Sequence, residues 1–164
     1  MKIGLNEDYL RSVIFGLQDG LVSTTGVVVG ISVGVSDQAI IILASFVAVS
    51  VEASSMAAGQ YSAEKAVHQI SGTGRHRDDL ITGSILMFLS YLGAGLIPIA
   101  PFLILQTDTA RIVSISAAFI SLFLIGFIKG KIVKIGTLRS AVEMLIIGGL
   151  ATIVGLIVGN FLKV

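Results

Sequence analysis

The sequence predicts an all-α integral membrane protein, a single domain that crosses the bilayer five times. Three observations predict this fold class. The 164 residues are 54% hydrophobic and only 13% charged, which is more apolar than a water-soluble domain of this size can bury. Five stretches have the roughly 20 apolar residues that cross a hydrocarbon core about 30 Å thick. The basic residues gather on alternate connections, as a repeatedly crossing chain requires.

The five predicted spans account for most of the chain. They cover residues 12–34, 38–61, 81–103, 111–129 and 140–162. The first follows basic residues, as the apolar part of a signal peptide does, but it is long and contains a buried aspartate. It also lacks a convincing small-residue cleavage site, so we expect a retained helix.

Basic residues predict the orientation of the spans, because cytoplasmic loops accumulate Lys and Arg. One group lies before span one, between spans two and three, and between spans four and five. It comprises Lys2, Arg11, Lys65, Arg75, Arg77, Lys129, Lys131, Lys134 and Arg139, whereas the opposite side holds Arg111 and Lys163. We therefore expect the N-terminus inside and the C-terminus outside.

Small residues recur at four-residue spacing in the first and last spans, which puts each set on one helix face. We expect these faces to pack helices closely within one subunit, with self-association as the alternative. The sets are Gly16 with Gly20, Gly26 with Gly30 and Gly34, and Gly155 with Gly159. Near the outer end of span three, Pro98 and Pro101 are expected to bend or end the helix.

Two predicted spans bring ionisable and soft side chains to similar depth. A charge deep in a bilayer costs at least about 2.5–3.5 kcal/mol, so it usually faces a cavity, a partner or an ion path. Asp19 lies roughly 12 Å beyond Arg11, and Met56 lies roughly 13 Å beyond Lys65, at 1.5 Å per helical residue. Glu52 precedes Met56 by one turn. We expect Asp19 and Glu52 to have a functional role.

The second span presents a strip of possible metal ligands. Glu52, Met56 and Gln60 follow one another at four-residue spacing and share one helix face. Carboxylate oxygens attract divalent cations, whereas a thioether favours softer transition metals over magnesium or calcium. We interpret Asp19, Glu52 and Met56 as a metal or proton site in a transport path, for which ferrous iron and manganese fit. Met56 taken alone is more often core or lipid-facing filler.

Several polar residues are weaker candidates. Gln60, Ser55 and Glu143 are secondary path residues, although Glu143 lies only about 6 Å beyond Arg139 and a solvated ion pair is the preferred interpretation. Hydroxyl groups in the spans are expected to bond to backbone carbonyls or between helices. They include Thr24, Thr25, Ser54 and Ser55.

The connection after span two contains further possible ligands. Glu64 and His68 are one helical turn apart and are candidates for cytosolic metal capture, together with His76, Asp78 and Asp79. A plain solvated connection is the favoured alternative, since polar loops are the norm.

The composition excludes several classes of function. The chain has no cysteine and therefore no disulfide, thiolate metal site or cysteine nucleophile. It also lacks a nucleophile–base arrangement, a phosphate-binding glycine loop and a closely spaced histidine motif, so we expect neither an enzyme nor a bound cofactor. A net charge of +1 gives no indication of a nucleic-acid partner.

Four segments resemble the vacuolar iron transporter family. Residues 15–22, with their Asp-Gly-Leu, resemble its opening helix, and residues 55–61, with their Ser-Met, resemble its second span. Residues 126–131 and 147–151 resemble the end of the fourth span and part of the fifth. Their order and spacing cover most of the chain. The resemblance is to a short form, because only residues 62–80 lie where plant members insert a glutamate-rich cytosolic metal-binding domain.

The resemblance implies a five-helix subunit that forms a homodimer, with a cation path near the subunit interface. It also implies export of ferrous iron or manganese from the cytosol against protons. Asp19 and Met56 match the path-lining aspartate and methionine of the family. Ala48 stands where some plant members carry a glutamate, and Glu52, one turn closer to Met56, is a possible substitute.

The resulting hypothesis is a divalent-metal/proton antiporter in which Asp19 and Glu52 alternately bind metal and protons. One alternative is a small proton-coupled exporter of organic cations, which an aromatic-lined cavity would favour. Another is a membrane scaffold without transport, in which the carboxylates bridge helices. We expect a prokaryotic cell membrane as the host, with an organelle (vacuolar) membrane as the alternative.

Overall fold

Five long helices form the protein, as described by a computed structural model. They are α1 (Glu7–Gly34), α2 (Gln38–Ser71), α3 (Arg77–Ile104), α4 (Thr107–Val133) and α5 (Thr137–Phe161). The structure describes residues 7–71 and 77–163, with only the backbone of residues 71, 77 and 78. Lys2, Arg75 and His76, and the side chain of Asp78, therefore lie outside the described residues.

The predicted all-α membrane fold is confirmed. All five helices are long and apolar enough to cross a membrane, and residues 7–71 and 77–163 contain no strand. Each predicted span lies within one helix, except that α5 ends one residue before the predicted boundary. The helices are longer than the spans, most of all α2, which continues ten residues beyond residue 61 to Ser71. The chain is thus a multi-pass membrane protein.

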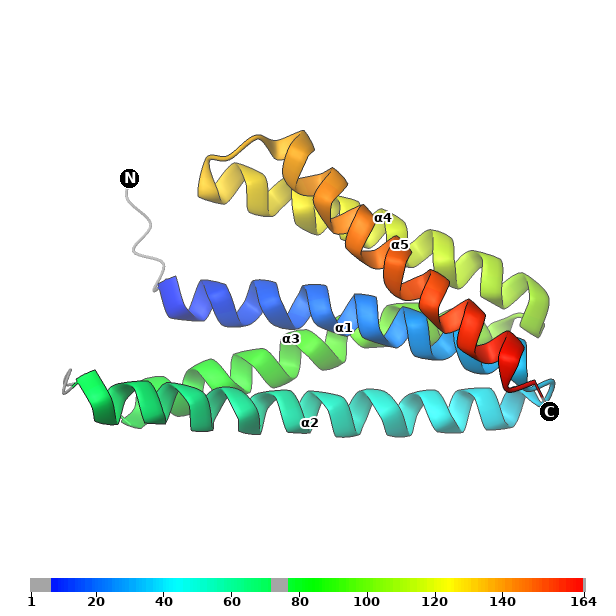
Figure 1. The fold of residues 1–164 in the computed structure, drawn as a ribbon, viewed down its shortest axis with the longest axis horizontal. Coiled ribbons are helices and arrows are strands. Elements are labelled where there is room, and N and C mark those ends of the chain that lie inside the picture. Colours follow the sequence, from blue (N-terminus) through cyan, green and yellow to red (C-terminus); the bar gives the residue numbers. More distant parts are fainter. Residues whose placement is uncertain (1–6, 72–76, 164) are drawn as a thin grey trace.

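The helices run up and down along one common direction, as Figure 1 shows. The start of α1 and the end of α5 lie at opposite ends of the bundle, as an odd number of crossings requires. The ends of α2 and α4 lie at the same end as the start of α1. Most of the basic residues between the spans are therefore brought to one end of the molecule.

Helix α1 is the centre of the bundle. It contacts all four other helices, most extensively α3 and α5 and least extensively α2. The two close contacts depend on glycine, because a Cβ atom at Gly20 would collide with the backbone of Tyr91 on α3. In the same way, Gly30 of α1 lies against Gly155 of α5, and Gly159 lies against Gly30. The predicted packing of small residues within one subunit is confirmed.

The interior of the bundle combines a hydrophobic core with a few small hydroxyl side chains, and the outer surface is apolar as well. Some buried hydroxyls donate to carbonyls one turn earlier, as from Thr25 to Leu21 at 2.5 Å and from Thr152 to Gly148 at 2.8 Å. Ser54 does the same to Ser50 at 2.8 Å, which confirms the prediction for Thr25 and Ser54. The buried hydroxyl of Thr24 has no partner among the described residues, so the prediction is wrong for Thr24. The outer surface instead exposes large aliphatic side chains, which face the acyl chains when the helices span a bilayer.

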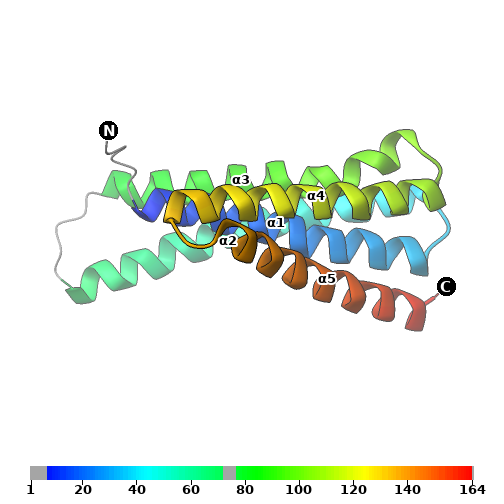
Figure 2. The same ribbon diagram turned by 90° about the horizontal axis from the view of Figure 1, so that it is seen from above.

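The two prolines lie inside α3, which continues to Ile104. Figure 2 shows that the last turns of α3 point in a different direction from the rest of the helix. The two prolines therefore bend α3 and do not end it. Side chains from neighbouring helices bond to this segment. Ser114 of α4 donates to the carbonyl of Pro98 at 2.7 Å, and Gln38 of α2 donates to that of Leu105 at 2.9 Å.

Candidate functional site

The carboxylate of Glu52 is held midway along α2 by hydrogen bonds from two other helices. Tyr91 of α3 donates its hydroxyl to Glu52 Oε2 at 2.6 Å, and Ser23 of α1 donates to the same oxygen at 3.2 Å. The Ser23 and Tyr91 hydroxyls also contact each other. Tyr91 is buried, with 1% of its surface exposed. Glu52 is thus a fixed acceptor at the point where α1, α2 and α3 meet.

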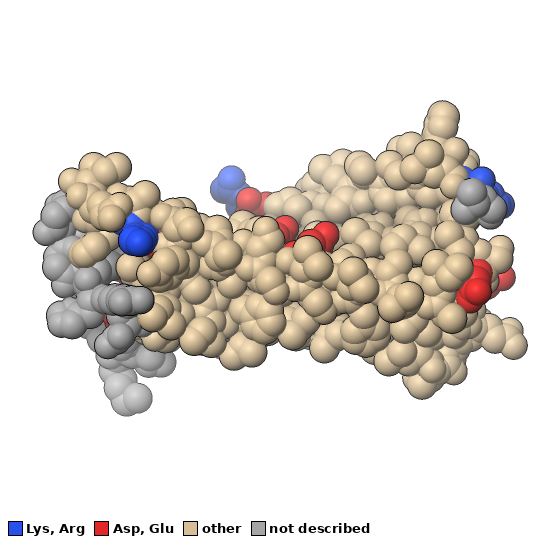
Figure 3. Space-filling view, turned by 90° about the horizontal axis from the view of Figure 1, so that it is seen from below, with Lys and Arg blue, Asp and Glu red and all other residues tan. Residues whose placement is uncertain are grey.

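Asp19 lies near Glu52 but is not anchored. The two carboxylates are close enough to interact electrostatically. Within residues 7–71 and 77–163, Asp19 has neither a hydrogen bond nor an ion pair, and it is only half-buried. Figure 3 shows acidic side chains at the surface midway along one face of the molecule. Two neighbouring carboxylates repel each other unless a cation or a proton lies between them. One fixed and one open carboxylate can therefore share such a charge.

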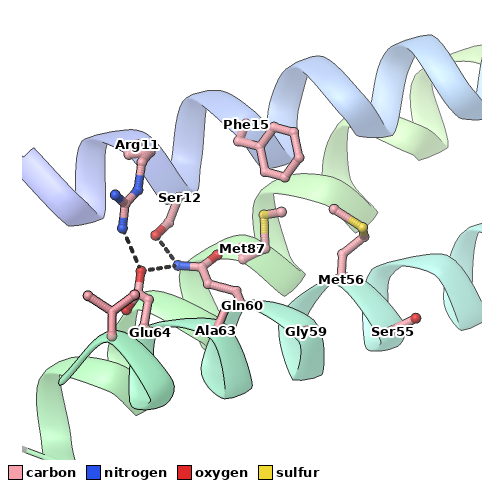
Figure 4. Close-up of a pocket in the computed structure, with 11 residues that line it drawn as sticks. Arg11, Ser12, Phe15, Ser55, Met56, Gly59, Gln60, Ala63, Glu64 and Met87 are labelled. Carbon is pink, nitrogen blue, oxygen red and sulfur yellow. Dashed lines mark hydrogen bonds and ion pairs between the residues drawn. The ribbon is translucent and has the colours of Figure 1, made fainter. Parts of the chain in front are cut away.

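A cavity of about 790 Å³ opens between α1 and α2, one turn away from these carboxylates. The sequence candidates Ser55, Met56, Gln60 and Glu64 all line it, as Figure 4 shows. Asp19 and Glu52 do not line the cavity. Asp19 follows Phe15 by four residues on α1, and Glu52 precedes Met56 by four residues on α2. Each carboxylate therefore lies about 6 Å further along its helix axis than the residue that lines the cavity. The cavity therefore leads toward the carboxylates and stops just short of them.

Polar side chains bridge α1 and α2 at the other end of the cavity (Figure 4). Arg11 donates to Glu64 Oε1 at 2.9 Å, and Gln60 donates to the same oxygen at 3.2 Å. Gln60 also donates to the hydroxyl of Ser12. The charge of Glu64 is thus matched by Arg11, and this pair lines the end of the cavity away from Asp19 and Glu52.

The candidates for cytosolic metal capture lie on the extension of α2 beyond the predicted span. Glu64 is paired with Arg11, and His68 follows it by one turn. Asp79, on α3, instead accepts a hydrogen bond from Tyr9 at 2.8 Å. In the part of the chain that is described, no three His, Cys, Asp or Glu residues are grouped to hold a metal ion. Capture by Glu64 and His68 stays a prediction.

Glu143 is exposed on α5 and does not line the cavity. The solvated ion pair expected with Arg139 is wrong for this structure, since the two described side chains do not form one. One helical turn separates them, but both side chains are exposed, and in water such a pair is barely favoured. The role of Glu143 as a secondary path residue stays a prediction.

Three residues of the site were not recognised as such in the sequence. Ser23 follows Asp19 by four residues, so the helical period alone places it on the same face. Tyr91 and Met87 are also four residues apart, on α3, but the sequence contains no signal that relates the rotation of α3 to that of α2. Packing of α3 against the glycines of α1 decides this rotation.

Replacing Tyr91 with phenylalanine tests the anchoring of Glu52. The ring stays, but the hydrogen bond at 2.6 Å is lost, so we expect the free energy of unfolding to fall by about 1–2 kcal/mol. Chemical unfolding in detergent micelles measures this change. Tyr61→Phe is the matched control, because Tyr61 lies on α2 away from Glu52 and no hydrogen bond of its hydroxyl is found among the described residues. An equal loss in both variants would contradict the anchoring role.

Comparison with known proteins matches this chain to one family. The sequence model of the VIT family matches residues 10–80 and 74–160. An uncharacterised protein of Methanocaldococcus jannaschii is 29% identical over 88% of this chain and 85% of its own length. Vacuolar iron transporter 1 of Oryza sativa is 33% identical, but over only 44% of this chain and 29% of its own length. Vacuolar iron transporter homolog 2 of Arabidopsis thaliana is 24% identical over 87% and 79% of the two chains.

Proposed function

The chain belongs to the VIT family, and from this premise we propose that it transports divalent transition-metal ions across its membrane. The proposed cargo is ferrous iron, manganese or both, exported from the cytosol in exchange for protons. The observation that carries the proposal is the open carboxylate of Asp19 near the anchored carboxylate of Glu52 at the end of a cavity lined by Met56. A transporter of this kind is not an enzyme.

The donor set favours borderline transition metals. Asp19 and Glu52 offer oxygens, which all divalent cations accept, whereas Met56 offers a sulfur that magnesium and calcium bind poorly. Ferrous iron, a borderline ion, accepts both kinds of ligand, whereas manganese, which prefers oxygen, depends mainly on the carboxylates. In the proposed cycle the ion passes Met56 and is then shared by the two carboxylates.

Competition for the carboxylates provides the proposed coupling to protons. A bound divalent ion offsets the repulsion between Asp19 and Glu52, and its departure leaves that repulsion uncompensated. Protonation from the opposite side of the membrane restores neutrality and resets the site. Asp19 is the carboxylate best placed to exchange its ligand, because Glu52 is already held by Tyr91 and Ser23.

A homodimer is part of the proposal, because Asp19 is half-buried in a single chain. A carboxylate left facing lipid costs several kcal/mol, and a second copy of this face would cover it and contribute a second carboxylate. Light scattering in detergent measures the mass of the particle. The dimer requires twice the chain mass of 17.1 kDa, and a particle of one chain mass argues against it.

The proposed orientation places the basic end of the bundle in the cytosol. Lys134, between α4 and α5, then faces the cytosol, and Lys163, after α5, faces outward. Because the chain has no cysteine, single cysteines at these two positions can be labelled selectively. An impermeant thiol reagent added to intact cells should label position 163 and spare position 134, and the reverse pattern contradicts the orientation.

Reconstituted vesicles test the function. Purified protein in vesicles with an imposed pH gradient should move ferrous and manganous ions faster than protein-free vesicles, and ion entry should be accompanied by proton movement. A metal-sensitive dye and a pH-sensitive dye inside the vesicles report the two fluxes. Absence of metal movement would overturn the proposal, and metal movement without proton movement would overturn only the exchange.

The organic-cation alternative is less well supported by the cavity. Among the described residues that line it, Phe15 is the single aromatic side chain, so cation–π contacts are few. Efflux of a fluorescent organic cation from the same vesicles distinguishes the two cargoes.

A further inference from the structure

A second methionine points into the cavity that leads to the carboxylates. Met87 of α3 lines the cavity together with Met56 of α2, and it is fully buried. Figure 4 shows the ends of the two side chains turned toward each other, with the ring of Phe15 beside them. The two thioethers thus line one cavity, although they are far apart in the sequence.

The approach of α3 to α1 places Met87 at this position. A Cβ atom at Gly16 would come within 2.9 Å of the Met87 carbonyl oxygen and would also collide with the hydroxyl of Ser90. Only a residue without a side chain lets the backbone of α3 come this close to α1. Met87 is therefore held beside Phe15, the neighbour of Gly16, by backbone packing.

The two thioethers and the two carboxylates form successive layers across the same three helices. Four residues separate Phe15 from Asp19 on α1, Glu52 from Met56 on α2, and Met87 from Tyr91 on α3. Because α2 runs opposite to α1 and α3, each step leads in the same direction. The layers are therefore about 6 Å apart on every helix. An ion entering from the end of the cavity away from the carboxylates meets the sulfur atoms first and the carboxylates second.

Sulfur at this level discriminates between ions before they reach the carboxylates. An ion that binds protein side chains here gives up water ligands, and the neutral thioether compensates this loss for soft and borderline transition metals but not for magnesium or calcium. Met56 alone offers one such ligand, and Met87 doubles it. Methionine side chains are flexible, so both sulfur atoms can adjust to the same ion.

We propose that Met56 and Met87 form a two-thioether site that binds soft and borderline transition-metal ions and selects the cargo. The inference rests on the proposed function for its transport role. The binding itself follows from the two sulfur atoms in one cavity and is measurable without transport.

Silver ion is the probe, because it is a soft cation that binds thioethers strongly. Titration calorimetry of the full-length protein in detergent should show one Ag⁺ site whose affinity falls at least about tenfold in Met87→Leu and in Met56→Leu. Leucine conserves the volume of methionine and removes only the sulfur. Met144→Leu is the matched control, since Met144 is also fully buried but lies on α5 outside the cavity. The Ag⁺ affinity of the Met144→Leu variant should stay within about twofold of that of the parent protein.

A spectroscopic measurement needs no variant and covers the case in which Met87→Leu does not fold. Silver-edge X-ray absorption of the parent protein with one equivalent of Ag⁺ should show two sulfur neighbours. One sulfur neighbour, or only oxygen and nitrogen, overturns the proposal, as does an unchanged Ag⁺ affinity in a folded Met87→Leu variant.

Transport separates this inference from the proposed function. In vesicles, Met87→Leu should lower the ratio of ferrous to manganous flux by roughly threefold or more, because manganese depends less on sulfur ligands. An unchanged ratio in a variant that still transports contradicts selection by Met87 and leaves the proposed function intact. If the parent protein moves neither ion, the proposed function fails, and the silver measurements alone decide whether the two-thioether site exists.

Discussion

Replacing Asp19 with asparagine is expected to reduce metal flux by at least about 10–100-fold, which is the usual effect of losing even a residue that only supports a metal ligand. The amide keeps the volume and the polarity of the side chain but cannot carry the negative charge that lies near Glu52. The remaining carboxylate is tied to Tyr91 and Ser23, so it cannot replace the lost ligand by moving. Vesicle flux of ferrous and manganous ions measures the effect.

The control for this variant is Asp108→Asn. It removes the same charge by the same substitution from a residue that is exposed at the start of α4 and lies outside the cavity. We expect its flux to stay within about twofold of the parent protein, since distant sites act independently. Normal transport by a folded Asp19→Asn variant would refute the carboxylate pair as the transport site. Equal losses in both variants would indicate a general effect of membrane charge.

Replacing Gly155 with alanine is expected to lower the free energy of unfolding by about 1–3 kcal/mol, the usual effect of overpacking a close contact. A Cβ atom there would overlap the backbone oxygen of Gly26 and come within 2.9 Å of its carbonyl carbon. The contact is formed by the backbones of both helices, and a helix backbone cannot change its local conformation to relieve an overlap as a side chain can. Helices α1 and α5 must separate, and this displaces the helix that carries Asp19.

Gly59→Ala provides the opposite control. Gly59 lies inside α2, and a Cβ atom added there meets nothing within 4 Å. Because alanine loses less backbone entropy in a helix, this variant should be more stable by about 0.5–1 kcal/mol. Chemical unfolding in detergent micelles compares the two. If Gly155→Ala is as stable as Gly59→Ala, the contact between α1 and α5 does not depend on glycine.

The number of helices was predictable from the sequence because membrane spans are defined by local properties. A run of apolar residues long enough to cross the hydrocarbon core is visible without any knowledge of its neighbours. The same is true of Asp19 and Glu52, whose charge is unusual at any position deep in a span. The four-residue spacing of Glu52, Met56 and Gln60 likewise follows from helical geometry alone.

The partners of these residues could not be predicted in the same way. A helix that is apolar on all sides does not reveal which face turns inward, because lipid and neighbouring helices are equally apolar. The rotation of α3 is decided by its close contact with Gly16 and Gly20 of α1. This contact brings Tyr91 to Glu52 and Met87 into the cavity.

The sequence by itself therefore determined that this protein is a bundle of five membrane helices with a costly carboxylate in each of the first two spans. It placed Asp19 level with Met56, whereas in the structure Asp19 lies about one turn beyond the cavity that Met56 lines. The tertiary structure alone decided that Glu52 is anchored while Asp19 stays open, and that a second thioether lies on the way to them. The physical reason is that span length and charge belong to single segments of chain. Helix rotation depends on where two backbones can touch, and glycine contacts between different helices set it here.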